Sequence, residues 1–177
     1  MSTRKFENHV PRIAATAFVD ETALVIGDVS IGADASLWPR VVARGDVNRI
    51  EIGARTNIQD GSVLHVSHDS EFAPGGFALR IGADITVGHK AILHGCTIED
   101  SCLIGMAATV MDGAIVRSGA IVGAGSLVPP GRDLDGGYLW VGSPARKVRP
   151  LRKQESSFLV YSAAHYVELK NRHLAVR

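Results

Sequence analysis

Two histidines stand close together in a stretch of sequence that otherwise follows a regular apolar rhythm. The stretch "VGHKAILHGC" runs from Val87 to Cys96 and holds His89 and His94. A third histidine, His65, lies in "VLHV", nearer the N-terminus. Imidazole nitrogens are common zinc ligands, and three of them with a water as fourth ligand form an open catalytic site. Whether these three can meet depends on the elements that carry them.

An aliphatic residue, once an alanine, returns at every sixth position over most of the chain. A period of six is neither helical nor a simple strand alternation, and it matches the hexapeptide repeats of parallel β-helices. Each hexad then supplies one short strand and one corner, and a triplet of hexads makes one triangular coil. The rhythm is carried by Ile13, Val19, Val25, Ile31, Leu37, Ala43, Ile52, Ile58, Leu64, Ile81, Val87 and Leu93 and, after a slip of one residue, by Ile98, Ile104, Val110, Val116, Val122 and Val128.

The repeats predict an all-β solenoid: a left-handed parallel β-helix of hexapeptide repeats with a C-terminal α-helix. The left hand is taken from a resemblance to known β-helices of this repeat, because general crossover rules favour the other hand. We expect a β-helix domain over residues 1–143, with a small insertion at 48–51 and a protruding loop at 66–79. Breakers after Val128 predict the end of the coil. Residues 144–177 then form an extension whose helix, expected over 151–173, packs back on the β-helix.

The hexad count places two of the histidines on one edge. If the insertion and the loop leave the corner count unchanged, the hexads that begin at Leu64 and Leu93 share a face. His65 and His94 then stack one coil apart, at about 4.8 Å. His89 belongs to the neighbouring face, too far away to share their metal within one chain. A common site therefore needs His89 from another copy, which a closed cyclic trimer provides.

Composition narrows the classes of function and compartment. Nineteen Lys and Arg against eighteen Asp and Glu give a formal charge of +1, which argues against nucleic-acid binding and favours a small-molecule substrate. No apolar leader or bilayer-length segment is present, so no membrane partner is expected. The two cysteines are too few for a disulfide framework and indicate a reducing, cytoplasmic compartment. Cys96 is a candidate ligand because it follows His94 closely, whereas Cys102 holds an interior position.

Three motifs together resemble one enzyme family. "ARGDVNRIEIGARTNIQDGSVLHV", "VGHKAILHGCTI" and "CLIGMAATVMDGA" are similar to the gamma-class carbonic anhydrases, and more closely to their shorter YrdA- and PaaY-type relatives. The resemblance implies a zinc site, with iron(II) as the alternative metal, in a homotrimer that shares each metal between subunits. Its metal ligands fall on His65, His89 and His94, and its supporting residues on Arg44, Asp46, Asn57, Gln59 and Asp60.

The implied activity is that of a lyase, the reversible hydration of carbon dioxide to bicarbonate by metal-bound hydroxide. Gln59 would hydrogen-bond the hydroxide or the product. Arg44 and Asp60 would form an intersubunit pair that fixes the site, with Asp46 and Asn57 behind it. Two plainer interpretations stay open: Asn57 as a turn residue, and Arg44 with Asp60 as an interface salt bridge alone.

The sequence departs from the family archetype at its proton-transfer positions. Val47 stands where the archetype has a glutamate after Arg-Gly-Asp, and the archetype's acidic loop is replaced by one with His68, Asp69 and Glu71. Proton export is therefore expected to be slow. The helix motif "YSAAHYV" resembles "YSANNYV" of the relatives, which makes Tyr161 a further candidate site residue.

Other classes of function use the same fold. Hydrolysis of coenzyme A thioesters is associated with PaaY-type relatives, and a zinc hydroxide could also perform it. Coenzyme A-dependent acyltransferases of the hexapeptide-repeat class use a lone histidine and share the exit "GSPARKVR". A non-catalytic trimeric assembly protein is the third alternative. Metal content separates these classes, because an acyltransferase would lose nothing to a chelator.

Overall fold

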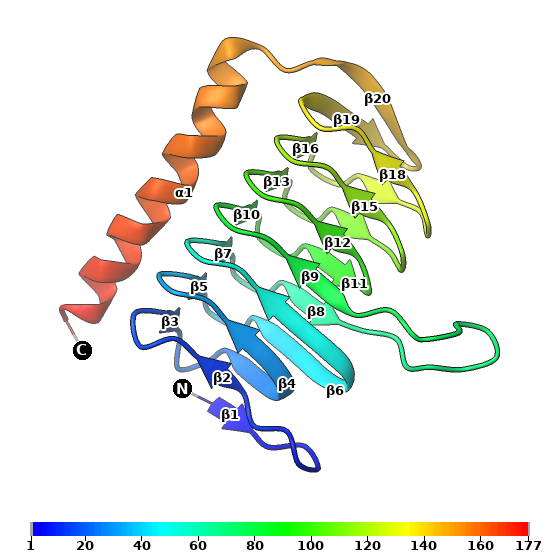
Figure 1. Ribbon diagram of the computed structural model, residues 1–177. Helices are drawn as coiled ribbons and strands as arrows, with labels where there is room; N and C mark the ends of the chain where they lie inside the picture. The colour runs from blue at the N-terminus through cyan, green and yellow to red at the C-terminus, as the bar shows by residue number, and fades with distance from the viewer. Residues whose placement is uncertain (1, 177) are drawn as a thin grey trace.

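Stacked parallel strands form a triangular prism with one helix laid along its side (Figure 1). The structure, a computed structural model, describes residues 2–176. Each coil of chain passes along three faces, and strands pair with their equivalents in the coils before and after. This is the predicted left-handed parallel β-helix with a C-terminal helix.

The strands fall on three faces, called faces 1, 2 and 3. Face 1 holds β1 (Ser2–Arg4), β8 (Val63–His65), β11 (Ile92–His94), β14 (Thr109–Val110) and β17 (Leu127–Val128). Face 2 holds β2 (Arg12–Ile13), β9 (Leu79–Ile81), β12 (Thr97–Ile98), β15 (Ile115–Val116) and β18 (Asp133–Leu134). Face 3 holds β3 (Phe18–Val19), β5 (Ser36–Leu37), β7 (Asn57–Ile58), β10 (Thr86–Val87), β13 (Leu103–Ile104), β16 (Ile121–Val122), β19 (Tyr138–Gly142) and β20 (Ala145–Pro150).

Two long strands run around the corner between faces 1 and 2. These are β4 (Leu24–Ile31) and β6 (Val42–Ile52), which join both faces into one sheet. Gly27 pairs with Gly45 and Val29 pairs with Ile50, so the extra residues of β6 lie at 46–49. The predicted insertion at 48–51 is therefore displaced by two residues. The extra residues bulge outward, and the hexads after them stay in register.

The aliphatic rhythm forms the core, as the repeats predict. The inward residues of all three faces are almost completely buried, and Leu64, Val87 and Leu93 have no exposed surface. Burial of each such side chain contributes roughly 1.5–3 kcal/mol. Cys96 and Cys102 are also buried in this core. Burial raises the pKa of both thiols, that of Cys102 to about 11. The alternative of Cys96 as a metal ligand is therefore excluded, since its thiol packs inside the prism.

The loop between β8 and β9 leaves the prism and returns to it (Figure 1). Antiparallel bridges from Ser67 to Phe77 and from Ser70 to Ala73 close the loop. The loop does not disturb the count of corners, because Leu64 before it pairs with Leu93 after it, and Ala43 pairs with Leu64 across the bulge of β6. The assumption behind the placement of the histidines is thus confirmed.

The coil continues one turn beyond the predicted exit after Val128. Strands β18 and β19 pair in parallel with β15 and β16, and β20 then folds back antiparallel on β19. The breakers in "PPGRDLDGG" form corners here instead of ending the coil. The expected boundary between residues 143 and 144 falls in the turn of the β19–β20 hairpin.

Helix α1 (Lys153–Leu174) packs back along face 3, close to its predicted bounds (Figure 1). Its start is closed by Glu155, which accepts a hydrogen bond from the Arg152 backbone at 2.8 Å. Near its other end the buried Lys170 donates to the Thr16 carbonyl and to Asp34, both at 2.7 Å. These contacts fix the helix over the coils that carry the candidate site.

Candidate metal centre

The end of face 1 brings two of the three histidines together. His65 closes β8 and His94 closes β11, and they are direct neighbours in the parallel register. His65 Nδ1 lies 3.1 Å from His94 Nε2. Two nitrogens bound to one tetrahedral zinc at about 2.1 Å stand about 3.4 Å apart. The pair therefore fits two positions of one coordination sphere, and the predicted stacking is confirmed. We call this corner the His65–His94 edge.

A carboxylate holds the other ring nitrogen of each imidazole at this edge. Asp46 Oδ1 lies 3.1 Å from His65 Nε2, and Asp112 Oδ1 lies 2.9 Å from His94 Nδ1. Arg44 in turn donates to Asp46 at 2.6 Å. Histidines that bind metals usually have such carboxylate partners, which fix the ring and make it a better ligand. The donor set therefore fits a metal ion.

Asp112 is a site residue that the sequence reasoning missed. It lies one coil beyond His94, because Val110 pairs with Leu93 in the strand register. Ser67, from the start of the loop, donates to the same carboxylate oxygen at 2.9 Å. Its signal in the sequence was an acidic residue at the corner position directly above a candidate ligand.

Burial and charge set the protonation of this edge. Burial lowers the pKa of His65, and the charge of Arg44 acts in the same direction against the hydrogen bond to Asp46. Burial alone would raise the pKa of Asp46, but hydrogen bonds from Arg44 and His65 bring it below its usual value. The favoured state is a neutral imidazole beside a carboxylate, which is the state a metal ligand requires.

His89 lies at a different corner, between faces 3 and 1. It sits in the turn between β10 and β11, where His89 Nδ1 lies 3.0 Å from Asp60 Oδ2. Both side chains are about half exposed, at 46% and 48%. This corner, called here the His89 edge, lies across face 1 from the His65–His94 edge. The predicted separation of His89 from the other two histidines is therefore confirmed.

No complete metal site exists within one chain over residues 2–176. In that range no group of three His, Cys, Asp or Glu side chains is arranged to hold one ion. The predicted partners Arg44 and Asp60 are also divided between the two edges, because Arg44 binds Asp46 and Asp60 binds His89. Their pairing between subunits stays a prediction.

A cavity of about 410 Å³ opens beside His89, between the prism and helix α1. Gln59 lines it and donates to Asn57 Oδ1 at 3.1 Å. Asn57 lies in β7 with no exposed surface, so the interpretation of Asn57 as a turn residue is wrong. The remaining lining residues are Thr86, Gly88, Leu103, Ile104, Gly105, Met106, Ala124, Phe158, Ser162 and Tyr166.

Tyr161 is not among the residues that line this cavity. Its side chain is 61% exposed and stacks on His165, with ring centroids 5.7 Å apart. Phe158, Ser162 and Tyr166 line the cavity from this helix, and the Phe158 ring also lies beside that of Tyr161, with centroids 6.1 Å apart. A role for Tyr161 at the site stays a prediction.

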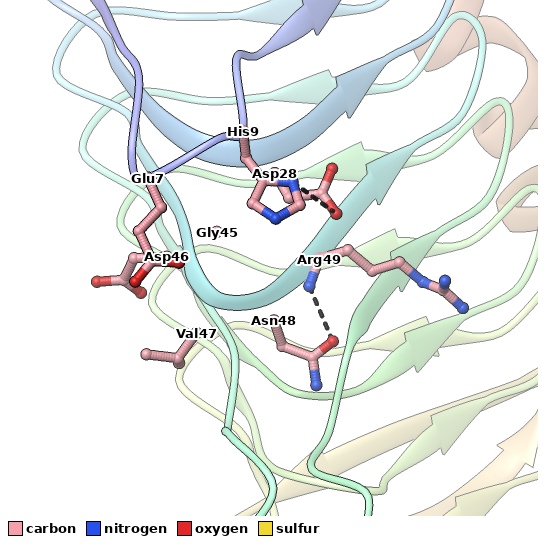
Figure 2. A pocket seen from close by; sticks show the side chains of 8 residues that line it. All are labelled: Glu7, His9, Asp28, Gly45, Asp46, Val47, Asn48 and Arg49. Carbon is pink, nitrogen blue, oxygen red and sulfur yellow. Dashed lines mark hydrogen bonds and ion pairs between the residues drawn. The ribbon is translucent and has the colours of Figure 1, made fainter.

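A second pocket, of about 350 Å³, lies behind Asp46 where the N-terminal segment meets the bulge of β6 (Figure 2). Figure 2 shows Glu7 and His9 on one side and Val47 on the bulge. His9 Nδ1 lies 3.9 Å from Asp28 Oδ2. Val47 is 45% exposed. It stands at the position of the archetypal glutamate, and as an apolar side chain it cannot carry a proton. His68, in the loop, is exposed.

Curated relatives cover almost the whole chain. Protein YrdA of Escherichia coli is 52% identical over 97% of this chain and 93% of its own length. A probable carbonic anhydrase of Methanocaldococcus jannaschii is 43% identical over 89% of this chain and 94% of its own. The mitochondrial gamma carbonic anhydrase 1 of Arabidopsis thaliana is 44% identical over 93% of this chain and 60% of its own. The chain belongs to the gamma-carbonic-anhydrase-like family.

Solved structures extend the likeness beyond carbonic anhydrases. A hexapeptide transferase family protein of Anaplasma phagocytophilum has a TM-score of 0.88 at 38% identity and covers 96% of each chain. A putative acetyltransferase of Bacillus cereus has a TM-score of 0.93 at 34% identity and covers 99% and 98%. No family model matches the chain. Membership of the gamma-carbonic-anhydrase-like family implies a metal cofactor, and proteins named as transferases share its fold. Over the described residues, no helix is long and apolar enough to cross a membrane.

Proposed function

We propose that this chain is a metal-dependent, gamma-class carbonic-anhydrase-like enzyme that interconverts carbon dioxide and bicarbonate. One observation carries the proposal: His65, His94 and His89 each have a carboxylate at one ring nitrogen, at 3.1, 2.9 and 3.0 Å. Backing of this kind orients metal-binding imidazoles. Zinc is the expected ion and iron(II) the alternative. A bound zinc ion would supply a water of pKa near 7, the nucleophile that hydration requires.

The enzyme is expected to be a homotrimer in which the His65–His94 edge of one copy meets the His89 edge of the next. Face 1, which lies between the two edges, supports this arrangement. Val63 and Ile92 pair on its outer surface, and they are 40% and 43% exposed. The equivalent row on face 2 carries Glu51 and Arg80 instead. An exposed apolar row favours contact with a second copy of the chain.

The side chains of this site have separable tasks in the proposed reaction. The carboxylates Asp46, Asp112 and Asp60 hold and orient the three imidazoles, which makes them better metal ligands. Gln59, held by Asn57, orients the attacking water or the hydroxyl of the product. Arg44 fixes Asp46 and is expected to reach Asp60 of the next copy. Two free buried thiols, Cys96 and Cys102, support a reducing, cytoplasmic location.

The cavity beside His89 favours a second candidate, hydrolysis of coenzyme A thioesters. About 410 Å³ lies within the usual range of small-molecule pockets and is far more than carbon dioxide fills. Much of the lining is apolar, with Leu103, Ile104, Met106 and Phe158 among its residues. An acyl group would find a suitable surface there. A coenzyme A-dependent acyltransferase would use the same fold and is the third candidate.

One comparison tests these candidates. Protein prepared without chelator is analysed for metal, and the same sample is assayed side by side for carbon dioxide hydration, thioester hydrolysis and acyl transfer. The proposal expects about one metal per chain and a hydration rate that falls on chelation and returns with zinc. Absence of stoichiometric metal, or acyl transfer that survives chelation, would overturn it.

A further inference from the structure

Four polar side chains form a continuous hydrogen-bonded chain from helix α1 to Gln59. Ser162 Oγ lies 2.8 Å from Thr86 Oγ1, and Asn57 Nδ2 donates to Thr86 Oγ1 at 3.0 Å. Gln59 Nε2 donates to Asn57 Oδ1 at 3.1 Å. All four residues are buried, with at most 6% of their surface exposed. Such a buried network tolerates one arrangement, because a flipped group would leave polar atoms facing the wrong partner.

A single backbone carbonyl sets the direction of this network. Asn57 Nδ2 also donates to the Ile85 carbonyl at 3.2 Å, and a carbonyl can only accept. Both hydrogens of the Asn57 amide are then used, so its oxygen must face Gln59. The Thr86 hydroxyl accepts from Asn57 and shares a further hydrogen bond with Ser162, in which either hydroxyl can be the donor.

The direction determines what Gln59 offers to the cavity. Its nitrogen Nε2 is turned toward Asn57, so the oxygen Oε1 is the end of the amide left for the space beside His89. An amide oxygen accepts hydrogen bonds and cannot donate them. A water or a hydroxyl group satisfies it, whereas an oxyanion is repelled.

We propose that Thr86 and Ser162 are positioning residues that, through Asn57, hold Gln59 with its amide oxygen toward the cavity. The role of that oxygen in catalysis rests on the proposed function, whereas its orientation does not. Helix α1 thereby contributes to the site through Ser162, the buried neighbour of exposed Tyr161. The docked helix thus orients Gln59 through Thr86 and Asn57, without a direct hydrogen bond to it.

The sequence offers a direct probe, since Gln59 and Gln154 are its two glutamines. Protein labelled with ¹⁵N in the glutamine side-chain amide gives one signal from each. Gln154 is exposed on helix α1 and serves as the internal reference. Solvent exchange of the Gln59 amide hydrogens reports its hydrogen bond to Asn57 without any assay of activity.

Thr86→Val removes the hydroxyl and keeps the shape of the side chain. We expect Gln59 amide exchange to rise about tenfold and its signal to move, with Gln154 unchanged, and Thr86→Ser to restore both. Thr97→Val, at the same strand position on face 2, is the matched control. Ser162→Ala should give a smaller change in the same direction, against Ser157→Ala on the exposed side of the helix. Ser162→Ala also provides the test if Thr86→Val fails to fold.

Activity is measured on the same variants. Thr86→Val should lower kcat/KM for hydration roughly 10- to 100-fold at unchanged metal content, as lost supporting contacts typically do. An unchanged Gln59 signal in folded Thr86→Val and Ser162→Ala would overturn the positioning role, whatever the activity. If the variants change the Gln59 signal as expected but the wild-type protein hydrates no carbon dioxide, the proposed function is overturned and the positioning role stands.

Discussion

The two edges of face 1 carry the same residue pair, a histidine with an aspartate, in different surroundings. At the His65–His94 edge the imidazoles contact each other, and Arg44 and Ser67 hold the aspartates behind them. At the His89 edge one imidazole and one carboxylate meet while about half exposed. The first edge is ordered by its own chain. The second has the form of a half-site, and the following predictions test that difference.

The largest expected effect is complete loss of metal from single-histidine variants and its partial return in mixtures. His65→Ala and His89→Ala should each bind almost no metal alone, because each leaves every shared site one ligand short. Co-expressed, the two variants should form mixed trimers with about one complete site each. Elemental analysis of mixed trimers, isolated by two different tags, measures this. Recovery of no metal in verified mixed trimers would contradict the sharing.

A charge on face 1 should break the contact between the His65–His94 edge of one copy and the His89 edge of the next. Ile92→Glu places a carboxylate in the apolar row, whereas Thr97→Glu makes the same change at the following strand on face 2. We expect Ile92→Glu to shift the protein to the mass of one chain and to lose its metal, with Thr97→Glu unaffected. Light scattering after size-exclusion chromatography measures the mass. A trimeric Ile92→Glu protein would show that face 1 lies outside the interface.

Neutralising the supporting aspartates should lower zinc affinity more at the His65–His94 edge than at the His89 edge. Asp112→Asn keeps an acceptor for His94 but loses its charge, and we expect zinc affinity to fall about 10- to 100-fold. Asp60→Asn acts on a half-exposed contact, where water screens the charge, so its loss should be about tenfold or less. Competition with a zinc chelator gives both affinities. Equal losses would mean that the His89 edge is as well ordered in the assembly as the other one.

Export of the proton from the site to solvent should be slow. Val47 cannot carry a proton, so hydration is expected to be slow in dilute buffer and to rise several-fold as imidazole buffer is added. His68→Ala should change the rate in dilute buffer less than about twofold, since His68 is exposed in the loop. Stopped-flow assays at several buffer concentrations measure both effects. A fast rate that does not depend on buffer would show that an internal group already exports the proton.

Much of this site could be predicted from the sequence because a six-residue period fixes geometry directly. Once Leu64 and Leu93 are assigned to one face, the stacking of His65 on His94 follows from strand spacing alone. The same count placed His89 at another corner. The displacement of the bulge to 46–49 did not change the predicted positions of the histidines, because the bulge projects outward and leaves the next pairing in register.

Other features depend on contacts that the period does not describe. Asp112 acts through a corner one coil away, and its link to His94 appears only when the coils are stacked. Cys96 was only a candidate ligand, and the structure excludes it, because the nearness of Cys96 to His94 in sequence does not reveal that its side chain points inward. Helix α1 was predicted, but the side that faces the cavity was not, because exposed Tyr161 and buried Ser162 are neighbours on a polar helix.

The smallest expected effect concerns the far end of helix α1, remote from both edges. Lys170 donates to Asp34, and this hydrogen bond is the main cause that lowers the pKa of Asp34 in the folded protein. A carboxyl with a lowered folded pKa contributes stability above its unfolded pKa of about 3.9 and loses it as pH falls through the folded value. Lys170→Met should therefore lower Tm by about 2–6 °C at pH 7, and less below about pH 4. Lys153→Met, at the exposed start of the helix, should leave Tm unchanged, and metal content should be normal in both. A Tm difference that stays constant down to pH 3 would assign the effect to packing of the Lys170 stem and exclude its charge.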